Sequence, residues 1–346
     1  MRKIKVVELC SGVGCALIAM NYAGITNISS FFSEIDKKAI KVYLKNYPDG
    51  IPLGRVENVT GASLGYVDVV TISSPCQDLS EAGKKNGLCT ICGIPVRTFE
   101  IYMHLKSQIY PNGQKKYKFR PSCVFWECIR VVRELQEINP NLLFLFENVV
   151  GPEWGPIMTE AIGVDPYEYN SADLTSQNRN RDYWSNIPLT PVKDRKILAV
   201  NAGDVVPGAV SGGGYRGVLK PDSHLYPKGQ KYNQKFTARK DRKHNKDFKF
   251  NCITATTPPA KNPEKRPGTC FYVDEYNNRF ELTITQLEKI QTYPEGHTAV
   301  EGLSDRDRQK LVGNGWTPYV ISELYFKNIL RALMEIERKL MEDVLP

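Results

Sequence analysis

The sequence has no long hydrophobic run, and its apolar stretches fall well short of the roughly 20 residues that a membrane-spanning helix requires. The short apolar stretch from Ile4 to Leu9 is followed too soon by polar residues to form a secretory signal sequence. We therefore expect an intracellular protein without a membrane segment, cytoplasmic in a prokaryote or phage and nuclear in a eukaryote.

The chain also has no disulfide framework. Its 9 cysteines are an odd number and are scattered from Cys10 to Cys270 without regular spacing. This usage fits a reducing compartment better than a disulfide scaffold, so we expect free thiols.

Acidic residues are scarce in one part of the chain. The net charge of the whole chain is +8, but residues 215–268 alone have 14 Lys and Arg against 4 Asp and Glu. Aromatic residues are interspersed among these basic residues: Tyr215, Tyr226, Tyr232, Phe236, Phe248 and Phe250. Such a mixture suits contacts to the phosphates and bases of a nucleic acid, although a solvated loop region is the alternative.

The N-terminal segment has the pattern of a nucleotide-binding element. Ile4 to Leu9 is expected to form a strand, and the glycine-rich turn Cys10 to Gly14 precedes a helix, so a ligand can approach the backbone. A second strand, Ile28 to Phe32, ends at Ser33 to Asp36, where an acid can hold ribose hydroxyls. Leu17 replaces the third glycine of the dinucleotide pattern, which favours S-adenosylmethionine as the cofactor.

A cysteine follows the next apolar strand. Val67 to Ile72 is expected to be buried and stops before Pro75, which cannot extend a sheet ladder and therefore lifts Cys76 into a loop. Ligands of parallel sheets bind at the carboxyl ends of the strands. Cys76 is therefore a candidate reactive thiol, with a buried structural thiol as the alternative.

An acid and two arginines complete the set of candidate site residues. The apolar strand Leu142 to Phe146 stops at Glu147, and burial of an unpaired carboxylate favours its neutral form, which makes it a candidate proton donor. The alternative is a carboxylate that caps the following turn. Arg179 and Arg181 share one face of an extended segment and together could bind a carbonyl oxygen or a phosphate.

Residues 88–120 interrupt this pattern, and we interpret them as an insertion. The insertion includes a basic string: Lys115, Lys116, Lys118 and Arg120. Cys89 and Cys92 have the spacing of half a zinc site, but only His104 and Cys123 lie near enough in the sequence to complete it. A structural zinc site normally has four ligands in a closed set, so we predict no metal.

Six motifs in order give the chain a resemblance to the DNA (cytosine-5)-methyltransferase family. They are ELCSGVG (8–14), SEID (33–36), SSPCQDLSEAG (73–83), FENV (146–149), SQNRNRDYW (176–184) and LVGNGWTPYV (311–320). The resemblance covers the chain except for the insertion and the weakly patterned residues 190–270. The sequence ITATT (253–257), together with the last motif, is especially similar to the de novo animal enzymes.

The resemblance implies an α/β fold of the Rossmann-like S-adenosylmethionine-dependent methyltransferase type, with a mostly parallel sheet and a smaller target-recognition domain. We assign residues 1–189, with the 88–120 insertion, to a catalytic and cofactor-binding domain. Residues 190–275 are assigned to target recognition, and residues 276–346 to a C-terminal segment that returns to the first domain.

The resemblance also implies roles for the site residues. Cys76 would add to carbon 6 of a flipped cytosine, and Glu147 would protonate N3. Arg181 would stabilise charge at O2, with Arg179 in support. The implied cofactor, S-adenosyl-L-methionine, would be contacted by Gly12, Gly14, Glu34, Pro75, Val124 and Asn314.

Two positions depart from the family pattern. Cys10 stands where the family usually has Phe, and Arg55 stands where it has an acid that binds the adenine amine. Glu57 or Asn58 could reach the adenine amine instead.

Double-stranded DNA is the expected partner. The loop after Cys76 would close over the duplex with Gln77, Ser80, Lys84 and Lys85. Base edges would be read from the basic 215–268 segment, with these residues as candidates: Arg239, Lys240, Arg242 and Lys243.

Three other functions remain open. A few members of this family act on tRNA, and the catalytic residues cannot separate the two substrates. A catalytically inactive, DNA-binding member is disfavoured by the presence of Cys76, Glu147 and Arg181. A nicotinamide-dependent oxidoreductase would have no use for this combination of residues.

Overall fold

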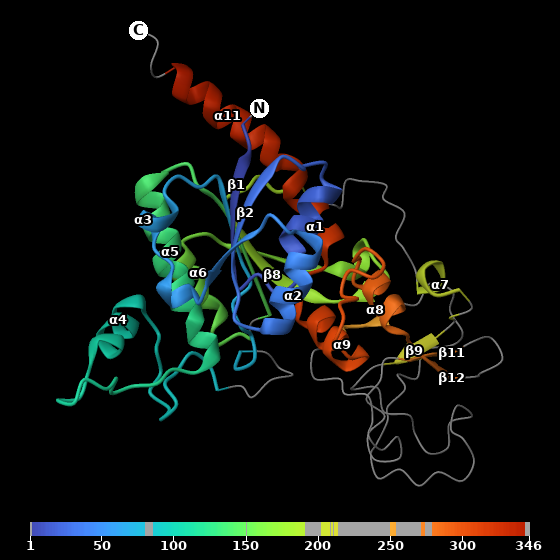
Figure 1. Cartoon of the computed structure of the whole chain (residues 1–346), viewed down its shortest axis with the longest axis horizontal. Coiled ribbons are helices and arrows are strands. Elements are labelled where there is room, and N and C mark those ends of the chain that lie inside the picture. Colours follow the sequence, from blue (N-terminus) through green and yellow to red (C-terminus); the bar gives the residue numbers. More distant parts are fainter. Residues whose placement is uncertain are drawn as a thin grey trace.

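The computed structural model describes residues 2–79, 86–149, 151–190, 202–207, 209, 211–213, 250–253, 271–273 and 279–342. At its centre is a seven-stranded sheet with the strand order β3-β2-β1-β4-β5-β8-β6 (Figure 1). Its strands are β1 (Ile4–Leu9), β2 (Ile28–Ser33), β3 (Ile51–Gly54), β4 (Val69–Ile72), β5 (Leu143–Asn148), β6 (Pro166–Asn170) and β8 (Asn180–Ser185).

The sheet is mostly parallel. β1 pairs in parallel with β2 and β4, and the pairs β2 with β3 and β4 with β5 are parallel too. β8 runs antiparallel to both β5 and β6. The prediction of an α/β fold with a mostly parallel sheet is confirmed, and the carboxyl ends of β1, β2, β4 and β5 lie at one edge.

Alternate residues of the central strands face two different hydrophobic layers. Val6 packs in one cluster with α1 (Cys15–Tyr22), whereas its neighbour Val7 packs in the other with α5 (Val124–Ile138). Figure 1 shows these two helices on opposite sides of the sheet. Because both faces are covered, every residue of β4 and β5 is buried, and most of their side chains are apolar, as the sequence pattern predicted.

The other helices surround this core. They are α2 (Lys37–Asn46), α3 (Gly61–Leu64), α4 (Phe99–Ser107), α6 (Gly155–Ile162), α7 (Ala202–Val205), α8 (Ile284–Ile290), α9 (Asp305–Asn314), α10 (Pro318–Leu324) and α11 (Ile329–Glu342). Short 3₁₀ turns are η1 (Val56–Asn58), η2 (Pro121–Cys123), η3 (Ser171–Asp173) and η5 (Phe326–Asn328). None of the helices in the described ranges is both long and apolar enough to cross a membrane.

Two smaller sheets lie outside the central one. β7 (Gln177–Asn178) pairs in parallel with β10 (Phe250–Asn251), which brings the strand before Arg179 beside the strand before Cys252. The second small sheet joins β9 (Ser211–Gly213), β11 (Phe271–Val273) and β12 (Arg279–Glu281). The composition of Ser211 to Gly214 predicts a flexible connection. For residues 211–213 that prediction is wrong, because their backbone pairs antiparallel with β11.

The spacing of four, three and four residues between Ile329, Leu333, Ile336 and Leu340 predicts that all four belong to the core. Ile329 is buried and Leu333 and Ile336 pack partly against the core, but Leu340 is 48% exposed. Figure 1 shows α11 extending past the body of the molecule, so its last turns lie away from the layers that bury Ile329. The prediction for Leu340 is therefore wrong.

Candidate active site

The loop that carries Cys76 is fixed to the end of the neighbouring strand. Asn148, the last residue of β5, donates from its side-chain amide to the carbonyl oxygen of Ser74 at 3.1 Å and to the Ser74 hydroxyl at 3.1 Å. The Leu79 amide donates to the Cys76 carbonyl oxygen at 3.0 Å, which turns the chain directly after the cysteine. Cys76 is a free, partly buried thiol at the carboxyl edge of the sheet.

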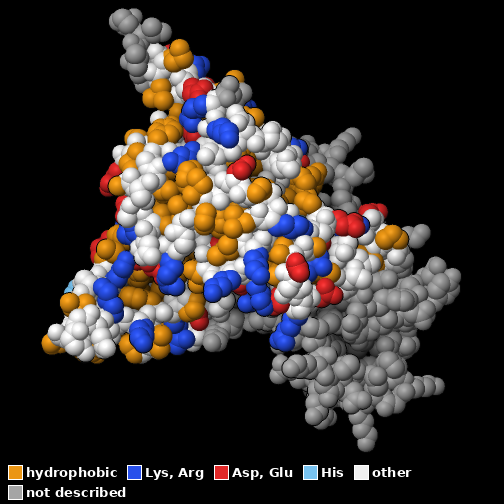
Figure 2. All heavy atoms as spheres, in the orientation of Figure 1, with side chains coloured by type: hydrophobic (Ala, Val, Ile, Leu, Met, Phe, Trp, Pro, Cys, Tyr) orange, Lys and Arg blue, Asp and Glu red, His pale blue; other side chains and the backbone are white. Residues whose placement is uncertain are grey.

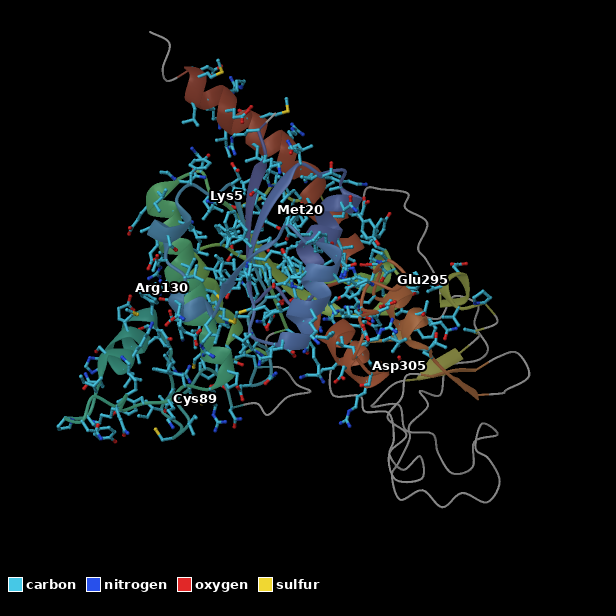
Figure 3. All side chains as sticks on the ribbon, in the orientation of Figure 1. Lys5, Met20, Cys89, Arg130, Glu295 and Asp305 are labelled. Atoms are coloured by element: carbon cyan, nitrogen blue, oxygen red, sulfur yellow. The ribbon has the colours of Figure 1, made fainter. Side chains whose placement is uncertain are left out.

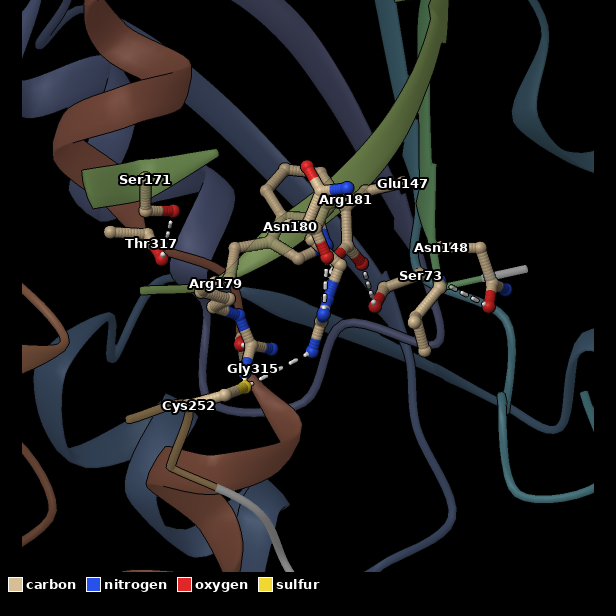
Figure 4. Close-up of polar contacts among 12 residues, drawn as sticks. Ser73, Glu147, Asn148, Ser171, Arg179, Asn180, Arg181, Cys252, Gly315 and Thr317 are labelled. Carbon is tan, nitrogen blue, oxygen red and sulfur yellow. Dashed lines mark hydrogen bonds and ion pairs between the residues drawn. The ribbon is translucent and has the colours of Figure 1, made fainter. Parts of the chain in front are cut away.

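Glu147 and Arg181 meet beside this loop. The Glu147 side chain is 7% exposed, and its Oε1 lies 3.1 Å from Arg181 Nε (Figure 4). The Ser73 hydroxyl donates to Glu147 Oε2 at 3.5 Å. The expectation of an unpaired carboxylate is wrong, because the antiparallel strand β8 places Arg181 next to the end of β5.

The electrostatic surroundings of Cys76 work in opposite directions. Burial raises the pKa of its thiol above the ordinary value, and the charge of Glu147 raises it further. The charges of Arg181 and Arg179 lower the pKa, but they do not outweigh burial. Cys76 is therefore mainly a protonated thiol near neutral pH, and the nearby charges of Arg181 and Arg179 favour the thiolate when it forms.

The two arginines point to the same side, as predicted for an extended segment. Arg179 is 3% exposed and donates from Nη1 to Cys252 Sγ at 3.2 Å and from Nη2 to the Gly315 carbonyl oxygen at 2.7 Å. Arg181 donates from Nη2 to the same sulfur at 3.7 Å. Figure 4 shows both guanidinium groups directed toward Cys252.

Cys252 is a site residue that sequence reasoning missed. Burial alone would raise the pKa of its thiol, but the charges and hydrogen bonds of Arg179 and Arg181 outweigh burial and hold the pKa below its ordinary value. The pairing of β7 with β10 creates this contact between residues 73 positions apart. The one available signal was the position of Cys252 directly before the ITATT motif (253–257).

We expect Cys252→Ala to destabilise the protein more than Cys252→Ser, because alanine removes the sulfur that accepts from both Arg179 and Arg181, at a cost of about 1 to 3 kcal/mol. A thiol whose pKa is lower in the folded chain stabilises fully above the ordinary value of 9.0, and this contribution fades as pH falls through the folded value. Urea unfolding at pH 6 and pH 9 measures the effect. If the free energies of unfolding of wild type and Cys252→Ala differ by the same amount at both pH values, the prediction that Cys252 is a thiolate in the folded protein is wrong.

Gly315 is required for close packing beneath the arginines. Its carbonyl oxygen accepts hydrogen bonds from Arg179 at 2.7 Å and from Gln291 at 2.9 Å. A Cβ at this position would lie 1.8 Å from the Tyr293 hydroxyl and 2.7 Å from Cys15 Sγ. Any side chain here would displace the carbonyl that orients Arg179, which explains the glycine in the last sequence motif.

The turns after β1 and β2 are joined by one carboxylate. Glu34 Oε2 accepts from the Gly12 amide at 2.8 Å, and Glu34 Oε1 accepts from the amides of Ile35 at 2.7 Å and Asp36 at 2.8 Å. Gly12 and Gly14 have φ values of 57° and 83°, which favour glycine. A Cβ on Gly12 would meet no atom within 4 Å, and the buried Ser11 hydroxyl has no hydrogen-bond partner in the described part of the chain. An open cradle with an unpaired polar atom can hold a ligand.

The other predicted cofactor residues border the same edge. Pro75 follows β4 and Val124 begins α5; both are partly buried. The Asp78 amide donates to the Ser122 hydroxyl at 3.2 Å, which ties the Cys76 loop to the start of α5. Asn314 is exposed at the end of α9, directly before Gly315.

The two departures from the family pattern are visible here. Cys10 has a φ of 57°, unusual for a residue other than glycine, and contact with its thiol, together with burial, raises the pKa of Cys128. Arg55 is exposed and forms an ion pair of 2.5 Å with Glu57. Asn58 is exposed beside them.

Few of the predicted DNA-binding residues can be placed. Gln77 is exposed on the loop directly after Cys76. The others lie outside the described residues: Ser80, Lys84, Lys85, Arg239, Lys240, Arg242 and Lys243.

Comparisons with known proteins agree with the motifs. Residues 4–99 match the family model described as C-5 cytosine-specific DNA methylase. The Orphan methyltransferase M.SPBetaI of Bacillus phage SPbeta is 33% identical over 157 residues, which are 44% of this chain and 34% of that protein. The chain thus spans about a third of the length of this relative.

Solved structures show the same fold. The S. pombe Dnmt2 methyltransferase superposes with a TM-score of 0.60 at 15% identity and covers 96% of this chain and 98% of its own. A mutant of Spodoptera frugiperda DNMT2 gives a TM-score of 0.55 at 17% identity, with coverage of 96% and 100%. These similarities confirm the expected Rossmann-like methyltransferase fold.

Proposed function

We propose, from the similarity of this chain to C-5 cytosine-specific DNA methylases, that it transfers a methyl group from S-adenosyl-L-methionine to carbon 5 of a cytosine in double-stranded DNA. The observation that carries the proposal is the meeting of three side chains at the carboxyl edge of the sheet. Cys76 lies in the loop after β4, while Glu147 at the end of the adjacent strand β5 forms an ion pair with Arg181.

The chemistry needs a nucleophile because carbon 5 of cytosine is itself a poor one. The Cys76 thiolate adds to carbon 6, and the ring electron pair moves until N3 takes a proton from Glu147, which leaves an enamine. Carbon 5 can then accept a methyl group. A base then takes the carbon 5 proton, and the electron pair of that bond forms the carbon 5–carbon 6 double bond and expels the Cys76 thiolate. N3 returns its proton to Glu147, which restores the neutral aromatic base.

The arginines balance the charge of these steps. Arg181 holds Glu147 through Nε and donates from Nη1 to the Asn180 carbonyl oxygen and from Nη2 to the Cys252 sulfur. The second N–H of each terminal nitrogen can donate to the O2 carbonyl of the base. Arg179 is fixed by Gly315 and Cys252 and is a positioning residue for this arrangement.

The residues after β1 and β2 suit the cofactor that this reaction requires. Bound S-adenosyl-L-methionine supplies an electrophilic methyl group on a sulfonium. Glu34 presents a carboxylate for ribose hydroxyls, while the open space at Gly12 and the unpaired Ser11 hydroxyl leave room for a ligand. Pro75, Val124 and Asn314 complete the proposed contacts.

The first test is bisulfite sequencing of DNA from cells that express the protein, because it reports substrate, position and sequence context together. Conversion-resistant cytosines that depend on Cys76 support the proposal. Methylation of tRNA with none in DNA would favour the alternative substrate. Binding of labelled NAD in place of S-adenosylmethionine would point to an oxidoreductase.

Two classes of DNA-binding variants should behave differently. Lys84→Ala and Lys85→Ala are expected to weaken binding at every sequence, because phosphate contacts carry no sequence information. Among Arg239, Lys240, Arg242 and Lys243, at least one alanine change is expected to alter the preferred context. Methylation of a randomised duplex, followed by bisulfite sequencing, measures both. If none of the four changes shifts the motif while a change in residues 88–120 does, recognition lies in the insertion instead.

A further inference from the structure

The 88–120 insertion has a strongly basic surface. It contains six Lys and Arg residues and one acidic residue, Glu100. Lys115, Lys116 and Lys118 are exposed, and within the described part of the chain no salt bridge involves them. We call these three lysines the basic face. In Figure 2, Lys and Arg side chains recur across the lower part of the molecule, which includes this insertion.

Backbone hydrogen bonds within the insertion support the basic face. The Ile91 amide donates to the Lys118 carbonyl oxygen at 2.7 Å, and the Lys116 amide donates to the Gln108 carbonyl oxygen at 3.0 Å. A β-bridge joins Ile109 to Lys115. The lysines are therefore held in place by backbone bonds rather than presented on an unsupported loop.

Buried side chains attach this support to the catalytic domain. Glu127 of α5 is fully buried and accepts hydrogen bonds from Tyr102 and Lys106, both of α4. Arg130 donates to the same carboxylate at 2.8 Å. Figure 3 shows Cys89 at the base of the insertion. It also shows Arg130 on α5, the helix to which the insertion is attached. Such a network fixes the insertion relative to the sheet edge.

Hydrogen bonds also attach the insertion to the loop that contains Cys76. Asp78, two residues after Cys76, accepts a hydrogen bond from the Gly87 amide at 2.8 Å through its carbonyl oxygen. Its own amide donates to Ser122 at the other end of the insertion at 3.2 Å. Both ends of the insertion are thus tied to the loop that presents Cys76.

We propose that the basic face binds backbone phosphates of the same DNA duplex whose cytosine reaches Cys76. The proposal rests on the proposed function, because a duplex placed over Cys76 lies next to both ends of the insertion. The positive charge of the basic face complements the phosphates. The rigid attachment of the insertion to the catalytic domain sets the distance between the lysines and the reacting base. The insertion then lengthens the DNA footprint without reading sequence.

The test compares wild type with the variant Lys115→Ala/Lys116→Ala/Lys118→Ala. On a long duplex with a central target cytosine, the variant should bind more weakly, and its salt slope should fall by about 0.9 for each phosphate that the lysines no longer neutralise. The difference from wild type should shrink as salt rises. On duplexes shortened from either end, the two proteins should become equal once the flank that the lysines bind is removed. The methylated sequence context should stay unchanged.

The matched control is Arg331→Ala/Arg338→Ala/Lys339→Ala on α11, which Figure 1 places at the opposite end of the molecule. This control should bind like wild type. If wild type binds and methylates the duplex but the insertion variant matches it in affinity and salt slope, the inference is wrong and the proposed function stands. Failure of wild type to bind any duplex overturns both. If the insertion variant binds structured RNA more weakly than wild type does but binds duplex DNA equally well, the partner of the basic face is RNA and the inference is wrong.

Discussion

Cys76→Ala is expected to abolish methyl transfer to DNA while the protein remains folded. The substitution removes one sulfur from a partly buried loop but eliminates the only group that we propose to attack carbon 6. Transfer of labelled methyl groups to duplex DNA measures the loss. Cys92→Ala, which removes an exposed thiol in the insertion, is the control and should retain activity. Full activity in Cys76→Ala would disprove the covalent mechanism.

A second measurement separates a missing nucleophile from a distorted site. A duplex with 5-fluorocytosine at the target should trap the wild-type protein, since fluorine cannot leave carbon 5 as a proton does. Cys76→Ala should bind this duplex without a covalent bond. Because burial raises the pKa of Cys76, alkylation of this thiol in the free protein should still accelerate with pH beyond the ordinary value of 9.0. A plateau below that value would mean that the arginines outweigh burial.

The sequence predicted the sheet and the convergence at its edge because both depend on local pattern. Apolar runs define the buried parallel strands, and the residues that end them must meet where those strands end. Cys76 and Glu147 are therefore brought together by β4 and β5, as expected. Glycines at Gly12 and Gly14 likewise follow from turns that need positive φ.

Long-range pairing accounts for what the sequence did not predict. The ion pair between Glu147 and Arg181 depends on β8 running antiparallel to β5, a direction that the strand pattern does not encode. The contact between Arg179 and Cys252 depends on two short strands far apart in the chain. Attachment of the insertion through Glu127 depends on a buried acid that a helical pattern alone does not distinguish from an exposed one.

Glu147→Gln is expected to lower the methylation rate by about 10²- to 10⁴-fold, the usual contribution of a general acid. Glutamine keeps the shape of the side chain and can still accept a hydrogen bond from Arg181, but it cannot deliver a proton to N3. Single-turnover methylation of a saturating duplex measures the rate without product release. Glu160→Gln, which neutralises an exposed carboxylate on α6, is the control and should leave the rate unchanged.

The effect of Glu147 on the pKa of Cys76 distinguishes a role of Glu147 as proton donor from a purely electrostatic role. The charge of Glu147 raises the pKa of Cys76, so glutamine should lower that pKa and make the thiolate more abundant at neutral pH. A slower reaction together with faster alkylation of Cys76 would place the defect in proton donation. Slower alkylation of Cys76 in Glu147→Gln would instead show that the glutamate supports the nucleophile. An unchanged methylation rate would move the proton donor to another residue.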